Sequence, residues 1–137
     1  IISLHKKDGS LISKLPAELL DRRLAITNKE RLVFSNYQRA KLISMDFDGQ
    51  EVFCVDTVVD GKLLKPAGMC CDRYGDIYIV LHASDELGTG EVHHYSAEGA
   101  HMGRIAHGLQ NPLGLTCTPN GELAVADVSS VKIYHKE

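Results

Sequence analysis

The sequence predicts an all-β fold, a partial β-propeller of about three blades, each a four-stranded antiparallel sheet. One pattern occurs at 66–81 and again at 112–127, 46 positions later (112 − 66 = 46), and a weaker copy lies at 24–34. Each copy is typical of a short apolar strand, a turn and a second strand rich in β-branched and aromatic residues. The two clear copies match at Pro66 and Pro112, Gly68 and Gly114, Cys71 and Cys117, and Gly75 and Gly121. A spacing of about 45 residues between such sheets is typical of propeller blades.

The elements follow in order as one hairpin and three repeat units. Residues 1–15 are predicted to form a hairpin at the Asp8-Gly9 turn, and 16–20 could make a single helical turn. The unit at 16–61 has strands at about 23–27, 31–36, 40–46 and 50–56, and the segment from Val58 to Lys65 is interpreted as a connector. The unit at 62–107 has strands at about 67–72, 76–82, 91–96 and 100–106, and the unit at 108–137 has strands at about 113–118, 122–127 and 130–135.

Three blades with an incomplete beginning leave sheet faces uncovered at both ends. The first fifteen residues look like the last two strands of a blade, and the final unit has three strands. Because a blade needs a neighbour on each face, we expect either further blades upstream or a homodimer that closes the ring. The chain begins at Ile1 without Met, and we therefore expect it to be a piece of a longer protein.

Composition narrows the function classes. The net charge is −3, from 15 Lys and Arg against 18 Asp and Glu, which does not indicate a broad nucleic-acid surface. No apolar run approaches the roughly 18 residues of a membrane span, so we expect no membrane partner. The four cysteines fall in apolar strand patterns and two are adjacent, which predicts reduced, buried thiols in a cytoplasmic protein. No Cys-x-x-Cys pair occurs, and no metal or other cofactor is predicted.

The repeated pattern resembles the NHL repeat: Pro-x-Gly-apolar-x-apolar-Asp, then Gly-x-Ile-Tyr-Val, then a strand and an Asp-Gly hairpin. The resemblance is clearest at 66–81 and 112–127, fair at 24–56 and weak at 1–15. NHL repeats form six-bladed propellers and are often the C-terminal domain of tripartite-motif (TRIM) ubiquitin ligases. The resemblance implies a non-catalytic substrate-recognition platform, downstream of a RING domain that this chain lacks. The Asn-His-Arg that the family carries between its second and third strands appears here only as 38–41.

The residue patterns favour binding over catalysis. No Gly-x-Ser-x-Gly or Cys-centred signature is present for nucleophilic chemistry. A metal-dependent propeller hydrolase or lyase needs several inner-strand carboxylates, but the inner-strand ends offer Thr27, Asp72 and Thr118, and Asp72 is expected to cap its own turn. His93 and His94 are neighbours in a strand, so they point to opposite faces and cannot chelate one ion together.

We expect the partner-binding site on one rim, where the entry to a blade and the joint between its second and third strands meet. A protein substrate or adaptor is the leading partner, because Arg and Tyr are favoured at interaction hot spots. Single-stranded RNA is the alternative, since guanidinium groups beside an aromatic ring suit a stacked base. The residues predicted for this site are Arg22, Arg23, Tyr37, Gln38, Arg39, Lys41, His82, Ser84, Asp85 and Glu86.

Overall fold

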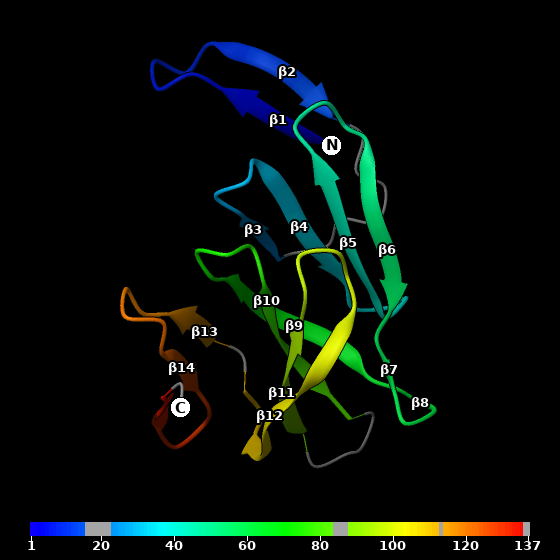
Figure 1. The fold of residues 1–137 in the computed structure, drawn as a ribbon, viewed down its shortest axis with the longest axis vertical. Coiled ribbons are helices and arrows are strands. Elements are labelled where there is room, and N and C mark those ends of the chain that lie inside the picture. Colours follow the sequence, from blue (N-terminus) through cyan, green and yellow to red (C-terminus); the bar gives the residue numbers. More distant parts are fainter. Residues whose placement is uncertain (16–22, 84–87, 113, 136–137) are drawn as a thin grey trace.

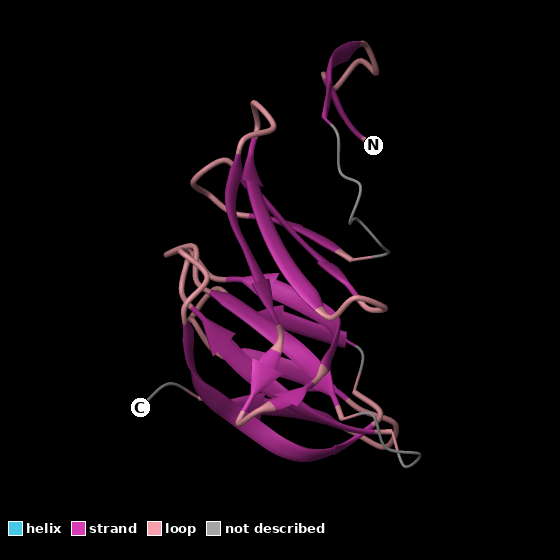
Figure 2. Cartoon of the chain, turned by 90° about the vertical axis from the view of Figure 1, so that its right-hand side faces the viewer, coloured by secondary structure: helices cyan, strands magenta, loops and turns pink. Residues whose placement is uncertain are grey.

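The computed structural model describes residues 1–15, 23–83, 88–112 and 114–135, and every regular element in these ranges is a β-strand (Figures 1 and 2). The sheets formed by 2–15, 24–56 and 65–110 follow one another along the long axis, and the sheet formed by 114–134 lies beside the third of them (Figure 1). The predicted all-β architecture is therefore confirmed, and the predicted helical turn at 16–20 falls outside the described residues. In the described ranges, no helix has the length and apolar character needed to span a membrane.

The chain opens with a hairpin of β1 (Ile2–His5) and β2 (Leu11–Leu15), which we call the opening hairpin. Its turn is closed by the Asp8 carboxylate, which accepts hydrogen bonds from the backbone N–H and the hydroxyl of Ser10 at 2.9 and 2.6 Å. Ile2 and Leu15 are buried against Leu32 and Phe34 of the next sheet. The predicted hairpin is present, and it packs on the blade that follows.

The first blade contains β3 (Leu24–Ile26), β4 (Arg31–Asn36), β5 (Lys41–Asp46) and β6 (Glu51–Asp56), paired antiparallel in that order. These bounds agree with the predicted strands to within about a residue at most ends. The β5–β6 turn is held by Asp46, whose Oδ1 accepts the N–H groups of Asp48 and Gln50 at 3.0 and 2.8 Å. The Asp-Gly signal in the sequence thus marks a real Asx-type hairpin turn.

A two-stranded hairpin, β7 (Val58–Val59) and β8 (Lys62–Leu63), lies where a plain connector was predicted. Asp60 and Gly61 form its turn with φ of 51° and 77°. Buried Thr57 anchors it: its N–H donates to Ala40 O at 3.0 Å, and its carbonyl accepts from Leu64 N at 2.9 Å. Two-residue strands are too short to show a period in the sequence, which is why the pattern missed them.

The middle blade contains β9 (Lys65–Cys71), β10 (Ile77–His82), β11 (Thr89–Tyr95) and β12 (His101–Gln110). All six residues of β10 are buried. Ile77, Ile79 and Leu81 pack toward the first blade. Tyr78 and Val80 pack toward the last sheet. The joint between the second and third strands is shorter than predicted, because β11 already begins at Thr89 and not at about 91.

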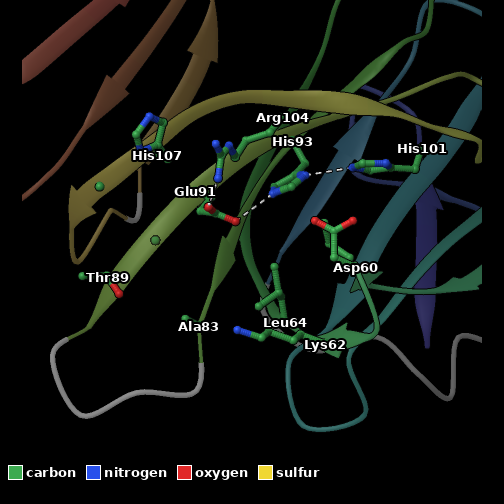
Figure 3. Close-up of a pocket in the computed structure, with 13 residues that line it drawn as sticks. Asp60, Lys62, Leu64, Ala83, Thr89, Glu91, His93, His101, Arg104 and His107 are labelled. Carbon is green, nitrogen blue, oxygen red and sulfur yellow. Dashed lines mark hydrogen bonds and ion pairs between the residues drawn. The ribbon is translucent and has the colours of Figure 1, made fainter.

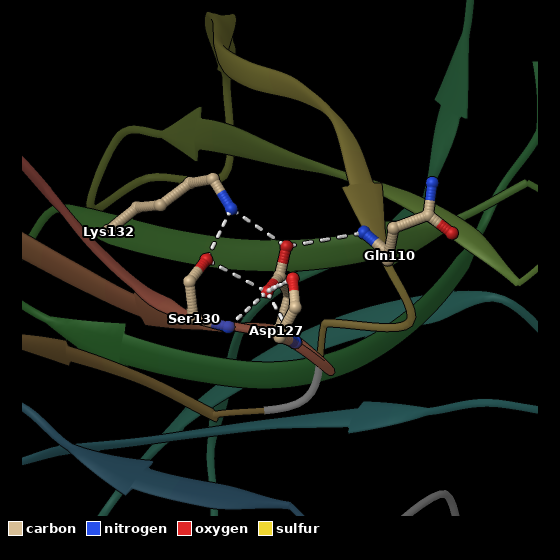
Figure 4. A network of polar contacts seen from close by, with 5 residues as sticks. Gln110, Asp127, Ser130 and Lys132 are labelled. Atoms are coloured by element: carbon tan, nitrogen blue, oxygen red, sulfur yellow. Dashed lines mark hydrogen bonds and ion pairs between the residues drawn. The ribbon is translucent and has the colours of Figure 1, made fainter.

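The last blade contains β13 (Gly114–Cys117), β14 (Leu123–Ala126) and β15 (Val131–Tyr134). A network at Asp127 joins it to the end of β12 (Figure 4). The Asp127 carboxylate accepts from Lys132 Nζ at 2.9 Å, from Ser130 N at 2.9 Å and from Gln110 N at 3.5 Å. Lys132 and these N–H groups hold the pKa of Asp127 far below its usual range.

Both ends of this series of sheets expose apolar side chains. At one end Leu24 and Ile26 on β3 are 46% and 58% exposed, because the opening hairpin covers only the outer part of the first blade. At the other end Val131 and Ile133 on β15 are 67% and 54% exposed. These strands present apolar surface of the kind that a neighbouring blade covers in a complete propeller.

The β11–β12 turn packs on the first blade at Gly99, which yields a stability prediction. Gly99 has φ of 90°, and a Cβ at this position would lie 2.6 Å from the Phe53 ring. We expect Gly99→Ala to lower the free energy of unfolding by about 2–4 kcal/mol, from backbone strain together with overpacking. Chemical denaturation measures this loss.

Gly9→Ala is the matched control, because Gly9 also has φ of 90°, but no atom of the described residues would lie within 4 Å of its added Cβ. It should cost only the backbone strain, about 1 kcal/mol. Equal losses for the two variants would show that Phe53 moves aside and that this contact between blades contributes little.

Candidate partner-binding site

The β4–β5 turn and the start of β9 come together on one rim of the molecule. Lys65 Nζ lies 5.1 Å from the centre of the Tyr37 ring, a cation–π contact between the first and middle blades. Tyr37 remains 38% exposed. Arg23 directly precedes β3, whose first residue pairs with Phe34, so Arg23 lies beside the same end of β4. We call the set Arg23, Tyr37, Gln38, Arg39 and Lys65 the aromatic rim.

The other residues predicted for this site lie in different surroundings. Lys41 is half-buried and forms an ion pair with Asp56 on the neighbouring strand. His82 is only 7% exposed, so it lies beneath the surface and offers little area to a partner. Arg22, Ser84, Asp85 and Glu86 lie outside the described residues. The role of this rim in binding therefore stays a prediction.

A cavity of about 700 Å³ lies between the β7–β8 hairpin and the outer strands of the middle blade (Figure 3). Its wall includes Lys62 from β8, Ala83 and Thr89 from the joint of β10 and β11, and five further polar residues of β11 and β12. The sequence did not reveal this cavity, because one of its walls is the hairpin that was interpreted as a connector.

A chain of hydrogen bonds crosses this cavity from Arg104 to His101 (Figure 3). Arg104 Nη1 donates to Glu91 Oε2 at 2.9 Å, and Glu91 Oε1 lies 3.1 Å from His93 Nε2. On its other side His93 Nδ1 lies 2.9 Å from His101 Nε2. His93 is fully buried, whereas His101 is exposed. The arrangement can orient His93 and connect its ring to solvent through His101.

Burial and the neighbouring groups act in opposite directions on the pKa values of His93 and Glu91, and both values are lowered. Burial lowers the pKa of His93 below its ordinary value, although the Glu91 carboxylate opposes the shift. Burial alone would raise the pKa of Glu91, but hydrogen bonds from His93 and Arg104 hold it below its usual range. At neutral pH Glu91 is therefore a carboxylate and His93 is a neutral imidazole.

His94 points away from this cavity, which confirms the prediction that neighbouring histidines face opposite sides of the sheet. Its ring stacks on Tyr78 with centres 4.7 Å apart, and its Nε2 lies 2.8 Å from Asp76 Oδ2. His94, Tyr78 and Asp76 line a second cavity of about 380 Å³ between the middle and last blades. Asp72, also on this wall, caps its own turn as predicted: its Oδ1 accepts from Tyr74 N and Asp76 N at 2.9 and 3.0 Å.

The described histidines and carboxylates do not gather into a metal centre. Among the described residues, no group of three or more His, Cys, Asp or Glu side chains is arranged to hold a metal ion.

Sequence comparison relates the chain to NHL-repeat proteins. It is 34% identical over 71 residues to human NHL-repeat-containing protein 4, covering 50% of this chain and 54% of that protein. The mouse protein of the same name is 35% identical over 87 residues, covering 62% and 60%. Mouse E3 ubiquitin-protein ligase TRIM32 is 40% identical over 70 residues, which are 50% of this chain and 10% of the ligase. The chain thus spans little more than half of the first relatives, and no protein-family model matches it.

Structural comparison settles the architecture. A gluconolactonase, XC5397 from Xanthomonas campestris, superposes with a TM-score of 0.76 at 24% identity and covers 98% of this chain and 51% of that structure. The chain folds as a partial β-propeller. A streptogramin B lyase superposes with a TM-score of 0.59 at 14% identity, covering 82% of this chain and 39% of the lyase. Identities this low show a shared fold, and the NHL-repeat relatives support an NHL-type domain within it.

The buried His93 predicts a pH-dependent stability. Because its pKa in the folded protein lies below the unfolded value of about 6.5, the unfolded chain takes up the proton first as the pH falls. The His93 contribution is therefore fully present above about pH 6.5 and is lost toward lower pH, with a slope of up to about 1.4 kcal/mol per pH unit. Denaturation between pH 5 and 7.5 measures this slope, and His93→Gln should flatten it.

His107→Gln is the control, because His107 lines the same cavity but is exposed on β12. Its stability should depend on pH as the wild type does. An unchanged slope in His93→Gln would show that another group is responsible.

Proposed function

We propose that this chain is a protein-binding propeller module that recognises a substrate or adaptor for a TRIM-type ubiquitin ligase. The observation that carries the proposal is the 34–40% identity to NHL-repeat-containing proteins and to a protein named as an E3 ubiquitin-protein ligase. On this proposal the module has no catalytic role of its own and acts in the cytoplasm.

The aromatic rim supports protein binding through its residue types. Tyr37 and Arg39 are exposed on a tight turn, and Arg39 N is held by Asn36 Oδ1 at 2.8 Å. Tyrosine and arginine are favoured at interaction hot spots, and the hydrogen bond to Asn36 fixes the turn that presents them. The Lys65 ammonium over the Tyr37 ring keeps this ring in place.

Replacement of Arg23 and Arg39 by Glu should abolish capture of specific partners without unfolding the module. Both side chains are exposed, so we expect the melting temperature to change by only about 1–2 °C. Proteins retained from a cell lysate by the tagged wild type and by the variant can be compared by quantitative mass spectrometry.

The control is Lys29→Glu with Arg73→Glu, two exposed cations on turns at the opposite ends of the strands. This pair makes the same change in charge and should leave capture intact. Equal capture by all three proteins would place the contact surface away from the aromatic rim.

Single-stranded RNA is the alternative ligand, and salt distinguishes it from protein. Binding of a fluorescent polyuridine to the wild type should be weak under this proposal. If it is tight and falls steeply between about 50 and 200 mM salt, counterion release by Lys and Arg is responsible and RNA is the ligand.

We further propose that two copies of this chain can close one ring. The chain covers 51% of one propeller structure and 50% of another, so two copies match one whole propeller in size. The apolar residues exposed on β3 and β15 would then be buried at the two junctions. Burial of apolar surface contributes about 25 cal/mol per Å² to such an association.

Sedimentation at micromolar concentration measures the outcome. We expect a species of about twice the 15.1 kDa of the single chain, with a concentration-dependent mass. Val131→Lys with Ile133→Lys should shift it to the monomer, because charges on β15 would be buried at the junction. A wild type that sediments at 15.1 kDa at every concentration would exclude the dimer.

A further inference from the structure

Two cysteines from neighbouring blades meet side by side. Cys70 Sγ on β9 lies 3.0 Å from Cys117 Sγ on β13. This separation is within about 1 Å of a covalent S–S bond, which is about 2.05 Å long. The sequence predicts buried thiols, and in the structure all four cysteines are half-buried and stand outside any disulfide bond.

The alternation of side chains along β9 explains why Cys70, and not Cys71, lies beside Cys117. Cys70 pairs with Tyr78 and Cys71 with Ile77 on β10. Tyr78 belongs to the apolar cluster shared with the last blade, and Ile77 to the cluster shared with the first. Adjacent residues in a strand face opposite sides, so Cys70 faces the last blade and Cys71 the first.

The repeat supplies the second thiol. Cys117 occupies the position in β13 that Cys71 occupies in β9, because it pairs with Leu123 as Cys71 pairs with Ile77. A residue at this position faces the preceding blade, and for Cys117 that is the middle blade, where Cys70 lies. In the first blade the position of Cys70 is taken by Ala25, which pairs with Val33. The geometry therefore brings two thiols together at the last junction and one at the junction before it.

Cys117 can be reached from outside. It lines the cavity of about 380 Å³ between the middle and last blades, together with Tyr78, His94 and Tyr134. The wall of this cavity does not include Cys70. A cavity of this volume has room for a small hydroperoxide.

We propose that Cys70 and Cys117 are an oxidation site at which a hydroperoxide forms a disulfide between the middle and last blades. The Cys117 thiolate attacks a peroxide oxygen, the O–O bond breaks, and a sulfenic acid and hydroxide form. The Cys70 sulfur then attacks the sulfenic sulfur, the S–S bond forms and a second hydroxide leaves. The two thiol protons neutralise the hydroxides, so hydrogen peroxide and two thiols give one disulfide and two waters.

Burial and hydrogen bonding of the cysteines affect the rate of this reaction. The hydrogen bond to Cys117 and burial both raise the pKa of Cys70, and burial raises the pKa of Cys71 to about 12. Thiols with raised pKa values react slowly at neutral pH, because the thiolate is the nucleophile. The raised pKa of Cys70 therefore slows the second step, in which Cys70 attacks the sulfenic sulfur.

The proposal is independent of which partner the aromatic rim binds. A disulfide here closes a long loop between two blades, which constrains the unfolded chain. We expect oxidation to raise the melting temperature by roughly 5–10 °C.

The test is a count of thiols and a peptide map of the whole 137-residue chain after treatment with hydrogen peroxide. The denatured protein should show four thiols before treatment and two afterwards, and a digest should contain one peptide that joins Cys70 to Cys117. Four remaining thiols, or a peptide that joins either residue to Cys54 or Cys71, would overturn the proposal.

Two variants separate the order of the steps. Cys70→Ser should form no internal disulfide, and its Cys117 sulfenic acid should be trapped by dimedone. Cys71→Ser is the matched control, one position along the same strand, and should form the disulfide as the wild type does. If Cys71→Ser loses the disulfide while its melting temperature is unchanged, Cys71 is the true partner and the assignment is wrong.

Discussion

The structure depends on the burial of β10 from both sides. Its six residues are all buried, and their side chains alternate between one apolar cluster shared with the first blade and another shared with the last. A sheet that is covered on one face only leaves half of such a strand in water, at a cost of about 25 cal/mol for each Å² of apolar surface. Each blade is therefore stable only next to another blade.

This two-sided packing also decides which polar groups meet. His93 and His94 are neighbours in the sequence, yet one lies with Glu91 and His101 in the cavity beside β7 and β8, and the other stacks on Tyr78 toward the last blade. A buried imidazole in this setting must be hydrogen-bonded on both nitrogens, and His93 is. The chemistry of each cavity therefore belongs to a junction between sheets and not to a single blade.

The repeat spacing was enough to predict the strand order, the hairpin turns and the turn cap at Asp72, because each of these depends on local residues. The contact of His93 with His101 could not be predicted. The pairing of β11 with β12 shifts register at several points, including Val92/His93 and His94/Tyr95, and each shift changes which side chains are opposite. The burial of His82 was missed for a similar reason, since the length of β11 depends on its pairing with β12.

The three blades differ most at the joints that follow their second strands. The inner strands and their turns keep the same residue types, because Thr27, Asp72 and Thr118 each accept backbone N–H groups of their own turn. The joints after the second strand are held by different side chains, Asn36 in the first blade and Asp127 in the last. There the copies diverge into the exposed turn at Tyr37 and the wall of the larger cavity. Partner recognition is best sought at the exposed positions of those joints, because a side chain that holds no turn can change without loss of the fold.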